Sequence, residues 1–300
     1  MILEKRLQAY GDVESNISLS KKTTFRIGGN CKYYIYPKSE LGLLRILDIL
    51  KEEQIPVKIF GKGSNILCSD DDYEGAIINL DRYFTDSYFE EDGTVVAQAG
   101  CSTVLLAHEA MKNSFSGLEF ASGIPGTIGG AIFMNAGAYK SDFSQIIEEV
   151  YALKDGTIVK IPKEELDFHY RHSDFQVHRD WIILGARMKL QPGDQKEIRD
   201  LMDSRRKRRM DSQPLDKPSA GSMFRNPESA QAWELIEKIG FRGKKIGGAM
   251  VSDKHANFIV NDDGASAKDI KELVEMIQKE VKERFGIDLI TEVERFNWKI

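Results

Sequence analysis

The chain has 300 residues, 41% of them hydrophobic, which is enough for two or three folded domains. A formal net charge of −5 argues against a protein built to coat nucleic acid, and no apolar run approaches the roughly 20 residues of a membrane-spanning helix. The first residues lack the apolar core of a signal peptide, and Cys31, Cys68 and Cys101 have no metal-ligand spacing. We therefore expect buried thiols, a cytoplasmic location and no metal site.

Up to residue 190 the pattern predicts short strands with few helices, which favours an α+β fold over a regular βαβ array. Residues 1–20 are expected to form a helical lead-in. Apolar residues at helical spacing over residues 41–50 predict a helix with Ser39 as its cap. Strands are predicted at residues 32–36, 57–60, 76–80 and 95–99, and a second helix at 103–112 with Ser102 as its cap.

Residues 116–139 contain six glycines, one proline and no basic side chain. Glycines at this density allow positive φ angles and close approach of the backbone to a ligand. Successive backbone N–H groups in such a loop form an anion site without Lys or Arg, and a diphosphate is the ligand we expect. The alternative is a purely structural turn, which rarely needs so many glycines.

The common nucleotide motifs do not fit. A P-loop sequence is absent, and the single Gly-x-Gly, at Gly61 and Gly63, has Ile66 where a Rossmann fingerprint needs its third glycine. The run Gly61-Lys62-Gly63-Ser64-Asn65 follows a predicted strand. It is either a second phosphate-contacting loop or an ordinary turn.

After the glycine-rich stretch, Asp155-Gly156 between two apolar segments predicts a β-hairpin, and residues 181–190 predict a strand. A domain boundary is expected near residues 191–194. The helix predicted at residues 196–210 ends in the run Arg205, Arg206, Lys207, Arg208 and Arg209. The run has three interpretations. The cations stabilise the C-terminal end of the helix through its dipole, they bind a phosphorylated ligand, or they form a nucleic-acid patch in a non-enzymatic binding module.

In the last third, Ser222 follows Ala220 and Gly221 between two prolines, and it is either a turn hydroxyl or a proton-transfer group. A helix is predicted at residues 230–239, ended by Gly240. Strands are predicted around Met250 and at residues 257–261 and 287–296. Ser266 and Asp269 predict a capping box for a long helix with the core face Ile270, Leu273, Val274, Ile277, Val281 and Phe285.

Seven blocks match one family in order: TTFRIGG, GKGSNIL, SGLEFASGIPGTIGGAIFMNAGAY, YRHSDF, SAGSMFRNP, KIGGAMVSDKHANFIVN and TEVERF. They cover nearly the whole chain, which thereby resembles the UDP-N-acetylenolpyruvoylglucosamine reductase family, in its shorter branch without a Tyr-bearing loop. Two positions depart from the family pattern. Lys140 follows Tyr139 where a glycine is common, and the terminal Glu-Val-Glu-Arg keeps Glu294 as a rival to Glu292 on the same face of the expected strand.

The resemblance implies an α+β flavoenzyme. A vanillyl-alcohol-oxidase/PCMH-type FAD-binding region would occupy residues 1–190, in two lobes that meet near 56–60. A smaller α+β substrate-binding domain would span residues 191–300, with the last strand returning to the active site. FAD would be non-covalent, because Ser64 and Asn65 stand where some relatives attach FAD through a His. The implied FAD contacts are Gly61, Lys62, Gly63, Ser64, Asn65, Ser122, Gly123, Ile124, Pro125, Gly126, Thr127, Gly129, Gly130 and Ala131.

The implied reaction reduces the enolpyruvyl ether of a UDP-sugar with NADPH, giving UDP-N-acetylmuramate for peptidoglycan synthesis. Its partners would be small molecules, without nucleic acid or membrane. Arg171 matches the cation beside the substrate carboxylate, Glu292 a second group on that carboxylate, and Ser222 the proton donor. The substrate contacts would be Tyr170, Asn226, Arg242 and Lys244, with Arg205 and Arg209 as further candidates. The alternative is another FAD-dependent oxidoreductase of the same fold.

Overall fold

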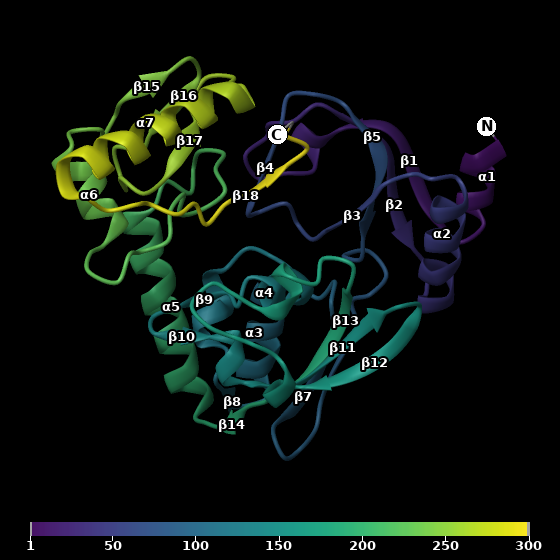
Figure 1. Cartoon of the computed structure of the whole chain (residues 1–300). Coiled ribbons are helices and arrows are strands. Elements are labelled where there is room, and N and C mark those ends of the chain that lie inside the picture. Colours follow the sequence, from purple (N-terminus) through teal and green to yellow (C-terminus); the bar gives the residue numbers. More distant parts are fainter. Residues whose placement is uncertain (1, 299–300) are drawn as a thin grey trace. The chain divides into compact units, whose positions relative to one another are not determined.

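The computed structural model describes residues 2–298 (Figure 1). Its α-helices are α1 (Ile2–Gln8), α2 (Glu40–Glu52), α3 (Thr103–Lys112), α4 (Ile128–Phe133), α5 (Gln195–Ser212), α6 (Ala232–Lys238) and α7 (Ala267–Phe285). Its longer strands are β1 (Gly11–Ser18), β2 (Asn30–Pro37), β3 (Val57–Phe60), β5 (Tyr73–Asn79), β7 (Thr94–Gln98), β11 (Ile147–Lys154), β12 (Thr157–Pro162) and β13 (Ile182–Lys189). The α+β class is confirmed.

The chain divides into two units, each built from separate segments. Unit 1 contains residues 1–14, 33–62 and 75–208, and unit 2 contains residues 15–32, 63–74 and 209–300. This division differs from the predicted boundary near residue 191, because most of α5 belongs to unit 1 and two N-terminal segments belong to unit 2. Long-range bonds hold those segments in unit 2, such as Asp70 Oδ1 accepting from the Ala267 N–H at 2.8 Å.

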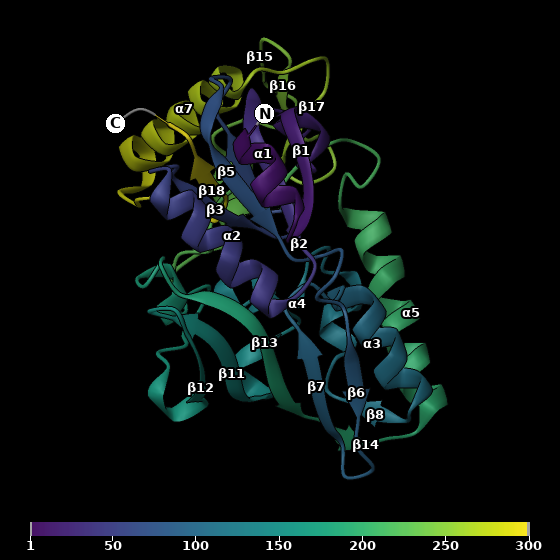
Figure 2. The ribbon, with the colours of Figure 1, turned by 90° about the vertical axis from the view of Figure 1, so that its right-hand side faces the viewer.

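Unit 1 contains two sheets. The first sheet has the strand order β1-β2-β5-β3, and the ends of β1, β2 and β5 are assigned to unit 2. The second sheet has the strand order β12-β11-β13-β7-β6, with β6 (Ser87–Phe89) at its edge. The apolar face of α2 shares one core with β2 and β5 (Figure 2), and α4 packs on β7 and β13. The glycine-rich stretch, which contains α4, is therefore fixed to the end of a buried strand.

Unit 2 is built on a small antiparallel sheet, β15 (Lys245–Ile246), β16 (Ala249–Val251) and β17 (Ile259–Asn261), which shares an apolar core with α6 and α7. A second pair joins distant parts of the chain, because β18 (Glu294–Phe296) lies parallel to β4 (Ile66–Cys68). The β18–β4 pair brings the C-terminal segment beside the run that follows Asn65.

Predictions from local patterns hold best. The Ser39 cap of α2, the bounds of α3, the β11–β12 hairpin at Asp155-Gly156 and the capping box of α7 are confirmed. Three details are wrong. Residues 1–20 form β1 as well as α1, Phe285 is 38% exposed, and the terminal strand covers Glu294–Phe296 rather than residues 287–296. Ser102 is the N-cap of α3, as predicted, but its side chain makes no capping bond.

The three cysteines are free and buried, as predicted. Burial raises the pKa of the Cys68 thiol to about 12 and that of Cys101 to about 11, which favours the protonated thiol at neutral pH. Within residues 2–298, no helix has both the length and the apolar character that crossing a membrane requires.

Lys140 occupies a strained turn position. The strands β9 (Gly137–Ala138) and β10 (Ser141–Asp142) pair in antiparallel register around a two-residue loop, in which Tyr139 has a φ of 57° and Lys140 a φ of 64°. Two positive φ angles match a type I′ turn, which favours glycine or asparagine. This geometry explains why a glycine suits this position and why Lys140 carries backbone strain.

Replacing Lys140 with glycine should stabilise the protein. Relief of left-handed strain outweighs the added entropy of the unfolded chain, for a net gain of about 0.5–1 kcal/mol and a rise in melting temperature of about 1–3 °C. Thermal unfolding followed by circular dichroism measures the change in melting temperature. Lys140→Ala is the matched control, because it removes the charge and keeps the strain. A glycine variant no more stable than the alanine variant would contradict the assignment of strain.

Candidate active site

The glycine-rich stretch is held by hydrogen bonds to the end of β7 and the start of α3. Ile124 and Gly126 accept bonds from Thr103, and the Gly129 N–H donates to Ala99 O at 2.8 Å. The Ile128 N–H donates to Cys101 O and the Gly130 N–H to Thr127 Oγ1, which caps α4. The expectation that successive N–H groups face an anion is therefore wrong for residues 128–131, whose N–H groups have protein acceptors.

The two predicted cofactor loops meet within unit 1. A Cβ atom added to Gly61 would lie 2.6 Å from Thr127 Oγ1, so the strand end at Gly61 contacts the start of α4. Buried Asn79 fixes Gly61, because its Nδ2 donates to Gly61 O at 2.9 Å and to the Tyr34 hydroxyl at 2.8 Å. Lys62, exposed, follows as the last residue of this segment of unit 1.

Glycine stands at different positions of this stretch for different physical reasons. Gly117 has a φ of +127°. A Cβ at Gly137 would meet Ser141 O at 2.3 Å, and one at Gly129 would meet the Ala99 Cβ at 3.0 Å, so these two glycines allow close backbone packing. Gly130 differs because it is exposed, and the nearest atom to a Cβ added there would be Thr127 Oγ1 at 3.5 Å. Protein packing therefore does not require glycine at position 130.

In unit 2, three segments that are distant in the sequence meet around Asn65. Gly63 has a φ of 61°, and a Cβ there would lie 2.3 Å from Lys22 O, so this loop admits only glycine. Asn65 Nδ2 donates to Glu292 O at 3.0 Å, and Asn65 O accepts from the Glu294 N–H at 2.9 Å. The predicted cofactor loop and the predicted active-site acid are thus adjacent in the backbone.

Ser222 lies on the other side of Glu292. The Glu292 N–H donates to Met223 O at 2.8 Å, and Ser222 itself pairs with Phe258 across an antiparallel bridge. Gly221, with a φ of +79° and open space around an added Cβ, turns the chain just before the serine. Ala220 and Met223 are buried while Ser222 is half-buried, so the serine backbone is anchored on both sides.

The structure separates the two rival glutamates. The prediction that Glu292 and Glu294 share a strand face is wrong, because β18 begins at Glu294 and Glu292 precedes it in irregular chain. Glu292 is bonded through its main chain to the residue after Ser222, whereas Glu294 is bonded to Asn65 and paired with Ile66. The Glu292 backbone therefore lies beside the segment of Ser222, and the Glu294 backbone belongs to the β18–β4 pair.

Asn257 is a positioning residue that sequence analysis missed. Its Oδ1 accepts from the Phe224 N–H at 3.0 Å, its Nδ2 donates to Phe224 O at 2.8 Å, and its carbonyl accepts from the Met223 N–H at 2.7 Å. Burial and the Arg242 charge lower the pKa of His255, so its neutral ring accepts the Asn257 N–H at Nδ1. Only the block KIGGAMVSDKHANFIVN pointed to this asparagine.

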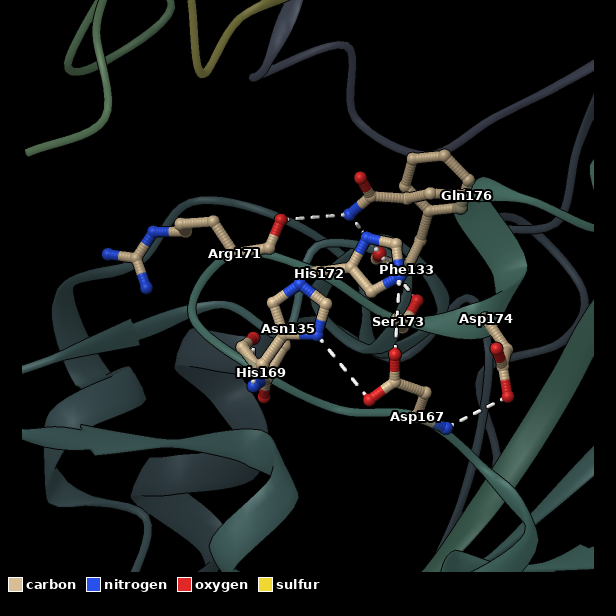
Figure 3. Close-up of polar contacts among 9 residues, drawn as sticks. All are labelled: Phe133, Asn135, Asp167, His169, Arg171, His172, Ser173, Asp174 and Gln176. Atoms are coloured by element: carbon tan, nitrogen blue, oxygen red, sulfur yellow. Dashed lines mark hydrogen bonds and ion pairs between the residues drawn. The ribbon is translucent and has the colours of Figure 1, made fainter. Parts of the chain in front are cut away.

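Arg171 is presented by a tight turn in unit 1 (Figure 3). His169 and His172 pair as an antiparallel bridge, and Arg171 between them has a φ of 59°, a conformation that costs a non-glycine residue about 1 kcal/mol or more. Its Nη2 donates to Gly137 O at 2.7 Å. Gln176, a second residue missed from the sequence, donates to Arg171 O at 3.0 Å and to Phe133 O at 2.9 Å, and so fixes this strained turn.

The expected substrate contacts all have protein partners. The Arg171 guanidinium lies 5.0 Å from the Tyr170 ring centroid, and Asn226 Oδ1 accepts from the Ala232 N–H at the start of α6. Arg242 pairs with Glu237 at 3.0 Å, and the Lys244 Nζ lies 3.9 Å from the Phe241 ring. In unit 1, Arg205 stacks on the Tyr139 ring at 4.8 Å.

Arg225 is a third residue that the sequence did not single out. Its Nε is buried and makes no hydrogen bond with the part of the chain that the structure describes. A buried guanidinium nitrogen without an acceptor is uncommon and costly, which sets Arg225 apart from its neighbours in this segment. Its place beside Asn226 in the block SAGSMFRNP was the available signal.

Comparisons with known proteins agree along the whole chain. Residues 31–162 match the family model of an FAD binding domain, and residues 213–296 match that of UDP-N-acetylenolpyruvoylglucosamine reductase, C-terminal domain. The reductase of that name from Clostridium novyi is 40% identical over 97% of this chain and 95% of its own length. The Bacillus subtilis reductase is 40% identical over 98% of this chain and 97% of its own. A Thermus caldophilus reductase structure matches with a TM-score of 0.82 and 32% identity, and the match covers 96% of this chain and 100% of that chain.

Proposed function

We propose the function of this chain from its family: it belongs to the UDP-N-acetylenolpyruvoylglucosamine reductase family, and it reduces the enolpyruvyl ether of a UDP-sugar. The chain is an FAD-dependent oxidoreductase, with an FAD-binding domain over residues 31–162. The observation that carries the proposal is identity of about 40% along nearly the full length of reductases. We assign the product as UDP-N-acetylmuramate for peptidoglycan synthesis in the cytoplasm, with NADPH as reductant.

Bound FAD would supply the hydride chemistry that links NADPH to the substrate carbon. The chain offers a place for it at Gly130, where a Cβ would meet no protein atom closer than 3.5 Å although the residue is glycine in a helix. Gly61 and Thr127 bring the two glycine-rich loops together at this point. The proposed contacts are residues 61–65 and 122–127 with Gly129, Gly130 and Ala131, and binding is non-covalent because Ser64 and Asn65 offer no attaching His.

Three side chains carry the substrate chemistry in this proposal. Hydride addition to the β carbon of the enolpyruvyl group pushes negative charge onto its carboxylate, which the Arg171 guanidinium stabilises. Glu292 lies beside the same carboxylate in this proposal: as the protonated acid it donates a hydrogen bond to it, and as the anion its repulsion is offset by the positive Arg171. Ser222 delivers the proton to the α carbon, and its backbone bonds to Asn257 and Glu292 through Met223 keep it in place.

Four further residues are proposed to hold the UDP-sugar: Tyr170, Asn226, Arg242 and Lys244. Arg242 is the weakest of them as an anion site, because Glu237 already pairs with it. Arg225 is a further candidate, since its buried Nε has no hydrogen-bond acceptor within the described residues. These assignments concern binding, so their alanine variants should change KM more than kcat.

The proposed function has a direct test. Purified protein should be yellow, should release FAD on denaturation, and should oxidise NADPH only when the UDP-enolpyruvyl sugar is added. Oxidation of NADPH with other acceptors but not with this sugar would favour a different FAD-dependent oxidoreductase. Protein that is colourless and does not take up added FAD would exclude the flavoenzyme.

The Gly130→Ala variant tests whether FAD contacts Gly130, separately from any effect on protein stability. Alanine is the better helix former by about 1 kcal/mol, and its Cβ meets only an ordinary contact at 3.5 Å, so the FAD-free variant should be at least as stable as wild type. If FAD passes this backbone closely, its affinity should fall about tenfold or more. Gly129→Ala is the contrast, because its Cβ meets the Ala99 Cβ at 3.0 Å and should lower stability. Unchanged FAD affinity in Gly130→Ala would remove Gly130 from the cofactor contacts.

A further inference from the structure

Three side chains around the Arg171 turn form a cluster suited to a metal ion. Asp167, His169 and His172 each offer one ligand atom, and the three atoms lie within 4.8 Å of one another. The Asp167 carboxylate faces both rings (Figure 3), with Oδ1 3.4 Å from His169 Nδ1 and Oδ2 4.0 Å from His172 Nε2. Sequence analysis expected no metal site, because it considered only the cysteines.

The separations are close to those of a metal site. Ligand atoms at about 2.0–2.2 Å from Zn²⁺ in a tetrahedral arrangement are roughly 3.3–3.5 Å apart. The contact of Asp167 Oδ1 with His169 Nδ1 already has this length, whereas the other ligand atoms, which lie within 4.8 Å, must move closer together when the metal binds. The His169 and Asp167 side chains are 59% and 65% exposed, so both have room to rotate.

The backbone that carries these ligands is fixed without a metal. The Asp167 N–H donates to Asp174 Oδ2 at 2.8 Å, and Asn135 Nδ2 donates to His169 O at 3.0 Å. Across the turn, the His172 N–H donates to His169 O at 3.0 Å, and the two rings stack with centroids 4.1 Å apart. Two imidazole rings and a carboxylate form a donor set that suits Zn²⁺.

We propose that Asp167, His169 and His172 bind one divalent transition-metal ion, for which Zn²⁺ is the probe. Two nitrogen ligands and one oxygen disfavour Mg²⁺ and Ca²⁺, which prefer oxygen alone. The exposed side of the site leaves the remaining positions to water. His169 and His172 are the two ends of the turn that contains Tyr170 and Arg171, so a metal ion bound to both restrains the strained backbone of Arg171.

The binding test does not depend on the proposed enzyme activity. Isothermal titration of the full-length protein, without a polyhistidine tag, should show one Zn²⁺ per chain and no binding of Mg²⁺. His169→Gln, His172→Gln and Asp167→Asn should each weaken Zn²⁺ binding at least tenfold. His108→Gln, which changes a histidine of the same unit outside the cluster, should bind as wild type does. Absence of Zn²⁺ binding by wild type, or cluster variants that bind as wild type does, would overturn the site.

The restraint of the turn has its own readout. Amide hydrogen exchange of peptides that span residues 167–174 should slow when Zn²⁺ is added to wild type, and should not change for His169→Gln. Exchange that is equally fast with and without bound Zn²⁺ would show that the metal does not restrain Arg171. Thermal unfolding of the three variants without Zn²⁺ should match wild type, which separates metal binding from misfolding.

Discussion

Replacing Arg171 with alanine should reduce turnover of the UDP-enolpyruvyl substrate by about 10² or more, the usual cost of removing a group that stabilises developing charge. FAD content should be unchanged, because Arg171 is not among the proposed FAD contacts. The structure gives a further reason to expect the loss of turnover. The positive φ of Arg171 and the Gln176 bond to its carbonyl hold its backbone in one conformation. Backbone strain at such a position is typical of functional residues.

Two variants make the Arg171 test specific. Arg171→Lys keeps the charge but loses bidentate bonding, so its turnover should lie between those of wild type and the alanine variant. Lys51→Ala is the control, since it removes an exposed cation of the same unit that is outside the proposed site. Arg171→Ala also loses the bond to Gly137 O, so its thermal stability must be measured beside its kinetics. Near-normal turnover with lowered stability would make Arg171 a structural residue of its turn.

The parts of the fold that depend on neighbouring residues could be predicted. The capping box of α7 needs only Ser266 and Asp269, and the end of the helix needs only Gly286, whose φ is 70°. Long-range pairing could not be predicted. The terminal strand is limited to three residues by its parallel partner at Ile66–Cys68, and no local pattern shows that residues 15–32 and 63–74 belong with the C-terminal unit.

The site shows the same contrast. Resemblance named Ser222 and Glu292, but not that their backbones are joined through Met223, nor that Asn65 reaches Glu292. The glycine count pointed to the cofactor region for a partly wrong reason, since Gly129 and Gly137 serve packing rather than positive φ. The stacking of His169 on His172 arises from a turn bridge, which a spacing of three residues does not reveal by itself.

Ser222 offers the sharpest test of mechanism, because its two possible roles predict different kinetics. As a turn hydroxyl it would contribute to stability, and its loss would slow both half-reactions alike. As the proton donor it acts only when the substrate carbon is reduced. The backbone contacts favour a structure that survives the loss of the hydroxyl, because Asn257, Glu292 and Phe258 hold this segment through main-chain bonds.

Ser222→Ala should therefore leave reduction of bound FAD by NADPH nearly unchanged, while reoxidation by the UDP-enolpyruvyl substrate slows by roughly 10²–10⁴, the usual effect of a positioned acid. Stopped-flow absorbance in the flavin band follows each half-reaction separately. Ser219→Ala is the matched control, since it removes a hydroxyl from the same segment three residues away and should leave both half-reactions intact. Equal slowing of both halves in Ser222→Ala, or reoxidation at the wild-type rate, would exclude Ser222 as the proton donor and leave the α-carbon proton to another group.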